Sequence, residues 1–238
     1  MQVVILSGGK GSRALPYTQS MPKAMMEVNG RPIIEQVMRV YANHGYTEFI
    51  LACGYLGESL VDYFRSNQYG WRVQCVNTGY DQLSGDRIYS LRSRLSGRFM
   101  LTYCDGLSDL DLRSLIRFHE KHGRIATLTG VACPTSQTLV FSDERGRVTQ
   151  LREEGTLEGL WINGGFFVLE LSVFSHWIGR DFERDIIPEL IARGELCMYK
   201  HNGFWGAMDT YKDQQALAKN WEQFSSKLDT ATWNTLRR

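Results

Sequence analysis

The first thirteen residues constrain the fold of this chain most strongly. They contain a short apolar run, Val3–Leu6, that breaks directly into Ser7-Gly8-Gly9-Lys10-Gly11-Ser12-Arg13. Such a run before a glycine-rich turn predicts a buried strand followed by a loop. Glycines let backbone N–H groups approach an anion closely, and Arg and Lys neutralise its charge. The loop is therefore a candidate phosphate-binding site at the start of the fold.

On its own, this loop could also be a purely structural turn. It matches neither the Walker A pattern nor G-x-G-x-x-G. Two cations, Arg13 and Lys23, favour the phosphate interpretation, because positive charge on both sides of a glycine-rich turn suits a triphosphate.

Length and charge exclude several other classes of protein. The chain has 238 residues and is 43% hydrophobic, which predicts one α/β domain with a substantial core. Its 27 basic and 26 acidic residues leave a net charge of +1, which argues against a general nucleic-acid or membrane-surface binder. The sequence has no uncharged apolar run of about 18 residues, so no membrane span is expected, and no signal peptide is expected from its first residues. The five scattered cysteines indicate reduced thiols and a cytoplasmic protein.

Strand-like and helix-like segments alternate along the first half of the chain. Expected strands are Val3–Leu6, Glu48–Ala52, Arg72–Val76, Phe99–Thr102 and Ile125–Val131, the last of these central in the sheet. Expected helices are Pro32–His44, Glu58–Arg65 and Asp111–His122. This alternation predicts a doubly wound, mainly parallel sheet of the Rossmann-like kind.

The pattern changes in the second half, although the whole chain, residues 1–238, is expected to be one domain. A hairpin is expected from Leu139–Phe141 and Arg147–Leu151, with a turn at Asp143–Gly146. Further strands are expected at Phe166–Leu169 and Leu196–Lys200, and helices at Leu171–Ile178, Phe182–Ala192 and Tyr211–Phe224. We therefore expect a nucleotide-binding half, about residues 1–130, and an acceptor half with the C-terminal helix, about residues 131–238.

Two aspartates are candidates for metal binding. Asp105 follows the Phe99–Thr102 strand, and ligands of doubly wound folds bind at the carboxyl ends of the strands. Its carboxylate would suit Mg²⁺, which takes carboxylate and phosphate oxygens, although a turn or cap role is equally compatible with the sequence. Asp209 precedes the last helix, and its local sequence favours an N-cap over a second metal ligand.

Other polar residues have simpler interpretations. Asp109 and Asp111 are expected to be turn and N-cap residues of the following helix. His119 and His122 share one helix without a carboxylate at metal-ligand spacing, so a structural role is expected. The sequence contains no recognisable Ser-His-Asp or Cys-His arrangement.

Several motifs together resemble those of a known family. Beyond the first loop, the chain contains Pro22-Lys23, Thr78-Gly79, Gly85-x-Arg87, Thr102-Tyr103-x-Asp105-Gly106, Ile162-Asn163-Gly164-Gly165 and Gly203-Phe204-Trp205-x-x-Met208-Asp209-Thr210. In this order they resemble the sugar-phosphate nucleotidyltransferases, and among these the glucose-1-phosphate cytidylyltransferase branch. The resemblance covers nearly the whole chain.

The resemblance implies a reaction and a set of site residues. CTP would donate CMP to a small phosphorylated acceptor and release pyrophosphate, with Mg²⁺ as cofactor. Lys23, Arg13 and Asp105 would be catalytic, and Asp105 and Asp209 would bind the metal. The nucleotide would contact Leu6, Ser7, Gly8, Gly9, Gly11, Ser12, Arg13, Lys23, Thr78, Gln82, Gly85, Arg87 and Asp105, with Arg87 reading the base. The acceptor would contact Glu154, Trp161, Asn163 and Gly164.

The chain departs from the family on the acceptor side. Glu154 occupies the position of a lysine that meets the sugar phosphate in relatives, and Ser136-Gln137-Thr138-Leu139 replaces a stretch that lines the sugar pocket. A carboxylate there would repel a phosphate by several kcal/mol in a cleft. Glu154 and Trp161 could instead hold an amine-bearing phosphate or phosphonate by an ion pair and a cation–π contact. Alternatively, Glu154 points to solvent.

Two rival functions are also compatible with the sequence. The chain could be a non-catalytic nucleotide sensor, or it could use UTP or dTTP. Relatives form homo-oligomers, but the shortened segment Arg65–Gly70 leaves it open whether this chain does so. No nucleic-acid or membrane partner is expected.

Overall fold

One mixed sheet forms the body of the protein. The computed structural model describes residues 1–66, 69–135, 139–152, 155–219 and 221. Within them, eight strands form a sheet of order β11-β8-β12-β6-β1-β4-β5, and β13 pairs with β8. The strands are β1 Val3–Leu6, β4 Glu48–Cys53, β5 Arg72–Asn77, β6 Phe99–Tyr103, β8 Ala126–Thr135, β11 Gly155–Asn163, β12 Phe167–Leu169 and β13 Leu196–His201.

Strand direction confirms a mainly parallel sheet. β1 pairs in parallel with both β4 and β6, β4 with β5, and β13 with β8. β12 is antiparallel to β6 and β8, and β11 is antiparallel to β8. β1 and β6 are neighbouring parallel strands, and Leu6 pairs with Tyr103, so the loops that follow these residues emerge side by side from one edge of the sheet. The expected strand at Ile125–Val131 is β8, which lies inside the sheet and runs on to Thr135.

Helices cover both faces of the sheet. α1 Ile33–Ala42, α2 Glu58–Ser66 and α4 Leu112–His122 pack on one face through residues such as Val37, Leu60 and Leu115. α3 Ser84–Ser90 and α5 Ile187–Ala192 pack on the other through Ile88 and Leu190. This three-layer arrangement is the doubly wound architecture expected from the alternating pattern. Short 3-10 segments lie at Ser12–Ala14, Tyr17–Gln19, Lys23–Met25, Arg92–Arg94 and Leu171–His176, and a π-helix lies at Phe182–Ile186.

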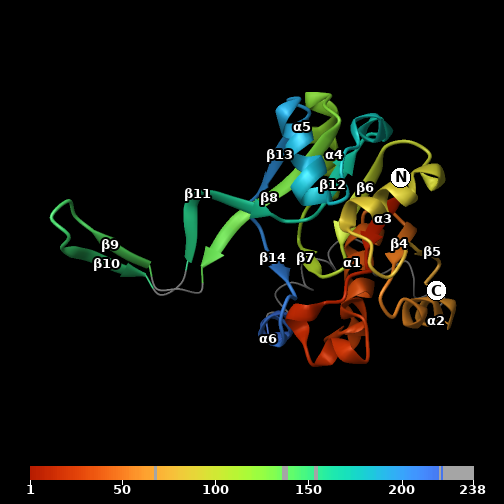
Figure 1. The fold of residues 1–238 in the computed structure, drawn as a ribbon. Coiled ribbons are helices and arrows are strands. Elements are labelled where there is room, and N and C mark those ends of the chain that lie inside the picture. Colours follow the sequence, from red (N-terminus) through yellow and green to blue (C-terminus); the bar gives the residue numbers. More distant parts are fainter. Residues whose placement is uncertain (67–68, 136–138, 153–154, 220, 222–238) are drawn as a thin grey trace.

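Three small sheets complete the fold. β2 Glu27–Val28 pairs with β3 Arg31–Pro32, and β7 Gly106–Ser108 pairs with β14 Trp205–Ala207. β9 Leu139–Ser142 and β10 Val148–Arg152 form the expected hairpin, which we call the arm. Figure 1 shows the arm projecting away from the body, beyond the ends of β8 and β11. α6 Tyr211–Lys219 packs beside β14 and β2.

The structure corrects several expectations in the second half. Leu171–Ile178 forms 3-10 turns at Leu171–His176 rather than an α-helix. The helix expected at Phe182–Ala192 is divided into a π-helix and α5, and Pro188 falls in the first turn of α5, where no N–H donor is needed. β11, β7 and β14 were not expected from the sequence. Among the described residues, no helix has the length and apolar character needed to cross a membrane.

Candidate active site

The glycine-rich loop begins where β1 ends, against the end of β4. The Ser7 backbone N–H donates to the Ala52 carbonyl at 3.2 Å, and its hydroxyl donates to the same oxygen at 3.3 Å. Gly11 has a φ of 61°, and its carbonyl accepts the Thr18 hydroxyl at 3.0 Å. A side chain at Gly9 would meet no atom within 4 Å. The loop therefore has open space at Gly9 and a fixed left-handed turn at Gly11.

Arg87 lies buried beneath this loop and ties it to its neighbours. Its two terminal nitrogens donate to the carbonyls of Gly8, Cys53, Gly79 and Tyr80 and to the Thr78 hydroxyl, at 2.7–3.2 Å. A Cβ on Gly8 or Gly54 would lie 2.3 or 2.5 Å from the guanidinium, so these positions need glycine to make room for it. This geometry favours a positioning role, and base reading by Arg87 stays a prediction.

Lys23 joins two carboxylates from distant parts of the chain. Its Nζ lies 2.5 Å from Oδ2 of Asp105 and 2.6 Å from Oδ1 of Asp209. The other oxygen of Asp209 accepts from Arg13 at 2.7 Å. Burial lowers the pKa of Lys23, but the two carboxylates outweigh this effect and hold it above its ordinary value. Lys23 is therefore a firmly protonated cation beside the phosphate loop.

The position of Asp209 corrects the cap interpretation. Thr210 and Asp213 bond reciprocally at the start of α6, because the Asp213 carboxylate accepts the Thr210 N–H and the Thr210 hydroxyl accepts the Asp213 N–H. This is a capping-box pattern. The carboxylate of Asp209 is directed to Lys23 and Arg13 instead. The N-cap prediction for Asp111 is confirmed, since its side chain accepts from the Arg113 N–H.

Asp105 and Asp209 form a donor set that fits magnesium. Mg²⁺ is usually held by one or two carboxylates together with substrate phosphates and water. No cluster of three or more His, Cys, Asp or Glu residues suited to a metal exists in the described part of the chain. The site would therefore depend on substrate oxygens for the rest of the coordination shell.

Thr78, Gln82 and Gly85, which were also expected to contact the nucleotide, have their contacts with Cys53, Arg87 and Arg180 instead of the Lys23 cluster. Thr78 bonds the Cys53 carbonyl and Arg87, and Gln82 accepts from Arg180 at 3.3 Å. A Cβ on Gly85 would lie 2.5 Å from the Arg180 carbonyl, which explains glycine there by helix packing.

Three residues expected on the acceptor side lie together at the end of β11. Asn163 donates to the Tyr103 hydroxyl at 3.2 Å, and the Gly164 carbonyl accepts from the indole of Trp205 at 2.8 Å. Trp161 lies two residues earlier, and the ammonium group of Lys200 lies 5.2 Å from its ring centroid. Glu154 and Ser136–Thr138 lie outside the described residues.

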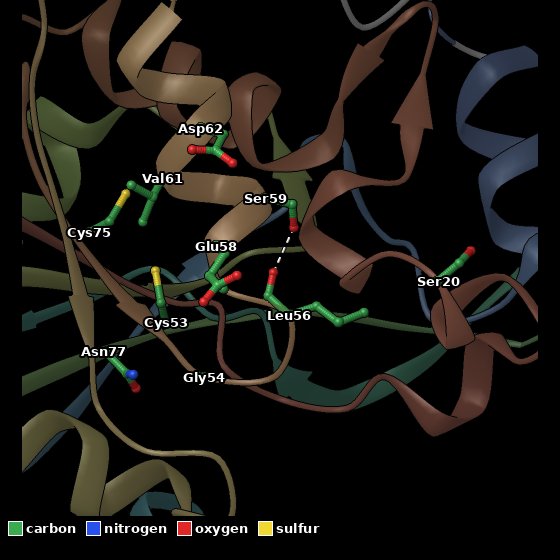
Figure 2. A pocket seen from close by; sticks show the side chains of 11 residues that line it. Ser20, Cys53, Gly54, Leu56, Glu58, Ser59, Val61, Asp62, Cys75 and Asn77 are labelled. Carbon is green, nitrogen blue, oxygen red and sulfur yellow. Dashed lines mark hydrogen bonds between the residues drawn. The ribbon is translucent and has the colours of Figure 1, made fainter.

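Two cavities open beside the proposed site, one next to the Gly8 loop and one next to Asp209. One, of about 610 Å³, lies between α2 and the ends of β4 and β5, and Cys53, Glu58, Asp62 and Cys75 point toward it (Figure 2). None of the expected site residues lines this cavity, although Gly54 in its wall adjoins Gly8. The other, of about 360 Å³, is lined by Phe204–Ala207, Asp209 and α6. The ionic cluster around Lys23 therefore locates the site better than cavity size does.

Comparison with known proteins decides the family. The Nucleotidyl transferase family profile matches residues 2–222. The chain belongs to the nucleotidyl transferase family. It is 35% identical to a probable glucose-1-phosphate cytidylyltransferase of Bacillus subtilis, over 94% of this chain and 97% of that protein. It is 34% identical to the glucose-1-phosphate cytidylyltransferase of Salmonella typhi, over 98% and 100%.

Solved structures share the fold of this nucleotidyl transferase. A putative glucose-1-phosphate thymidylyltransferase from Bacillus anthracis superposes with a TM-score of 0.73 at 18% identity, covering 92% of this chain and 96% of that one. HddC from Yersinia pseudotuberculosis, complexed with GMP-PN, gives a TM-score of 0.71 at 18% identity, covering 92% and 99%. These similarities support the Rossmann-like fold expected from the sequence.

The structure also places residues that sequence reasoning missed. Glu183 accepts hydrogen bonds from Tyr103 and Asn163, although it lies 80 residues from the first in the chain. No local sequence signal marks Glu183, because its partners come from two other strands.

The two histidines have the structural role expected from the sequence. His119 and His122 bond Thr127, and His119 also bonds Glu170, so these histidines link α4 to β8.

Proposed function

We propose that this nucleotidyl transferase moves CMP from CTP to a small phosphorylated acceptor and releases pyrophosphate. One observation carries the proposal: Lys23 contacts both Asp105 and Asp209 beside a glycine-rich loop. Similarity to glucose-1-phosphate cytidylyltransferases over nearly the whole chain supports CTP as donor and glucose 1-phosphate as acceptor.

The residues of the site suit phosphoryl-group chemistry. An oxygen of the acceptor phosphate would attack the α-phosphorus of CTP, and the bond from that phosphorus to the pyrophosphate oxygen would break. Lys23 and Arg13 would neutralise the charge on the transferring group, and Gly8, Gly9 and Gly11 would let loop N–H groups approach the phosphates. Such a transfer needs positioning and charge stabilisation rather than a covalent nucleophile.

We infer that Mg²⁺ is the cofactor and that Asp105 and Asp209 would hold it. When bound, it would neutralise phosphate charge and orient the leaving pyrophosphate. The two carboxylates would then exchange their contact with Lys23 for the metal, which leaves Lys23 to bind phosphate oxygens.

The amine-bearing acceptor considered from the sequence has weaker support. It depends on a cation–π contact with Trp161, and Lys200 of the same chain already lies over that ring. An acceptor ammonium group would compete with Lys200 for Trp161. We therefore favour a sugar phosphate over an amine-bearing phosphate.

Pyrophosphate release tests the donor and the acceptor together. Purified protein with Mg²⁺ is assayed with CTP, UTP or dTTP, each with glucose 1-phosphate or with 2-aminoethyl phosphate. We expect the fastest release with CTP and glucose 1-phosphate. Fastest release with UTP or dTTP would overturn CTP as donor. Nucleotide binding without release, for every pair, would favour the non-catalytic sensor.

We also propose a cytoplasmic homo-oligomer. All five cysteines are free thiols, which suits a reducing compartment. The arm supports oligomerisation, because Val140, Val148 and Leu151 on it are each more than 60% exposed. A two-stranded hairpin is marginally stable alone in water, so a second copy of the chain is expected to cover the arm.

A further inference from the structure

The carboxylate of Glu183, near the proposed transfer site, is held in place through one of its two oxygens. Oε1 of Glu183 accepts from the Tyr103 hydroxyl at 2.5 Å and from the Asn163 amide at 3.3 Å. Within the part of the chain that the structure describes, its other oxygen, Oε2, has no hydrogen-bond partner. Glu183 is exposed, so this oxygen can accept hydrogen bonds from a ligand.

Several contacts fix the backbone and the partners of Glu183. The Asp181 side chain accepts from the Glu183 N–H. The neighbouring Phe182 ring is buried against Phe167, with the two ring centroids 5.2 Å apart. The Asn163 side-chain oxygen accepts from the Gly165 N–H at 3.0 Å, which fixes the amide so that its NH₂ group faces Glu183. The carboxylate is therefore preorganised, which reduces the entropy lost when a ligand binds.

Connections through the backbone place Glu183 next to the transfer site. Tyr103, which donates to Glu183, lies at the end of β6, two residues before Asp105. On the other side, Gly164 is bonded to Trp205, whose strand pairs with the residues that follow Asp105. Glu183 thus borders the space where an acceptor would lie when its phosphate reaches the α-phosphorus.

The charge of Glu183 restricts what it can bind there. A fixed carboxylate repels the acceptor's phosphate, so it must face the other end of the acceptor molecule. Hydroxyl groups are suitable partners, because each donates a hydrogen bond and carries no charge. We propose that Glu183 accepts a hydrogen bond from a hydroxyl group of the acceptor and so selects among phosphorylated acceptors by the position of that hydroxyl. This inference rests on the proposed function.

A comparison of variants with acceptor analogues tests this inference. Glu183→Gln keeps the shape of the side chain and removes its charge. We expect kcat/KM for glucose 1-phosphate to fall about tenfold to a hundredfold, as for loss of a hydrogen bond to a charged group, while KM for CTP stays unchanged. In wild-type protein, one of the 2-, 3-, 4- or 6-deoxy analogues should show the same loss. With the Glu183→Gln variant, kcat/KM for that analogue should be no lower than kcat/KM for glucose 1-phosphate.

Glu189→Gln is the matched control, because Glu189 lies on the adjacent α5 and pairs with Arg193, away from Tyr103. It should leave kcat/KM for every acceptor unchanged. An equal loss by Glu183→Gln for all acceptors, or a raised KM for CTP, would indicate a structural role and overturn the inference. So would a selective loss with 2-aminoethyl phosphate, which would indicate an amine-binding site.

Failure of the proposed function would look different. If wild-type protein releases no pyrophosphate with any pair, calorimetric titration of glucose 1-phosphate in the presence of CTP and Mg²⁺ still tests Glu183. Weaker binding to Glu183→Gln than to wild type, lost with the same deoxy analogue, supports the inference. Equal binding, or no binding to wild type, overturns it.

Discussion

At the residue scale, Arg87 shows how a residue expected to read a base can have another role. Its guanidinium meets four backbone carbonyls and one hydroxyl, contributed by the Gly8 loop, the end of β4 and residues 78–80. The motif Gly85-x-Arg87 singled out this arginine, and its expected contact with the nucleotide stays a prediction. The acceptors could not be predicted, because those on Gly8 and Cys53 lie 79 and 34 residues away in the chain.

Arg87→Lys should lower the free energy of unfolding by roughly 2–3 kcal/mol, because an ammonium group cannot donate in the same planar fork and leaves buried carbonyls unpaired. Urea denaturation measures this loss. Arg92→Lys, at an exposed arginine bonded to the Tyr89 carbonyl, should change stability little. If Arg87→Lys keeps full stability and changes only the preferred nucleotide base, direct base reading is the better explanation.

Lys23→Met should reduce kcat by about 10²–10³-fold, because positive charge at the transferring phosphoryl group is lost. It also leaves Asp105 and Asp209 facing each other without their shared cation. Mg²⁺ should therefore raise the thermal unfolding midpoint of Lys23→Met more than that of wild type. Lys10→Met, which removes an exposed lysine paired with Asp81, is the control. An equal Mg²⁺ shift in all three proteins would count against Asp105 and Asp209 as metal ligands.

At the element scale, α4 and β8 were predicted well because their signals are local. Asp111 caps α4, Gly123 ends it with a φ of 63°, and an apolar face lies between them. β11 gives no such signal, since a register shift between Leu157 and Trp161 breaks the two-residue alternation. β7 and β14 have three residues each, too few for any periodicity.

The contact between α4 and β8 predicts how stability depends on pH. Burial lowers the pKa of His119 below its ordinary value of 6.5, against the opposing effect of Glu170, and burial together with His119 lowers that of His122. The unfolded chain then binds more protons than the folded one just below pH 6.5. The contribution of these histidines is therefore complete above that pH and is lost as the pH falls below it.

Urea unfolding between about pH 8 and pH 5 measures this dependence. His119→Gln should flatten the decrease in unfolding free energy across that range, whereas His176→Gln on the Leu171–His176 turns should not. Arg98, Glu120, Arg124 and Glu195 also act on the pKa values of this pair. An unchanged slope in His119→Gln would show that the histidines do not carry the effect.

At the scale of the whole molecule, the sequence predicted a doubly wound body and a hairpin, but not how far the hairpin extends from the body. The turn at Asp143–Gly146 lies between two short strand-like segments, so the sequence predicts that these segments pair. The pairing of β9 with β10 confirms this. The direction of the arm depends on β8 and β11, whose pairing continues to Thr135 and Gly155. Nothing local in the sequence encodes that extension.

Leu151→Asp should dissociate the proposed oligomer, because it places a charge on the exposed apolar face of the arm. Sedimentation velocity should show wild type larger than the 27.3 kDa monomer and the variant at monomer size. Ile191→Asp, at an equally exposed position on α5, should leave the assembly intact. A monomeric wild-type protein would overturn the proposed oligomer.

The ion pairs around Lys23 have a consequence for which anions can enter. Arg13 and Lys23 bring two positive charges and Asp105 and Asp209 two negative ones, so the resting cluster is electrically balanced. A bare inorganic phosphate ion gains little, because each cation it would meet already has a carboxylate partner. A ligand that carries its own cation can exchange partners pairwise, cation to carboxylates and phosphates to Lys23 and Arg13. If phosphates bind here as proposed, these pairs would favour phosphates that arrive with a counter-cation over bare phosphate ions.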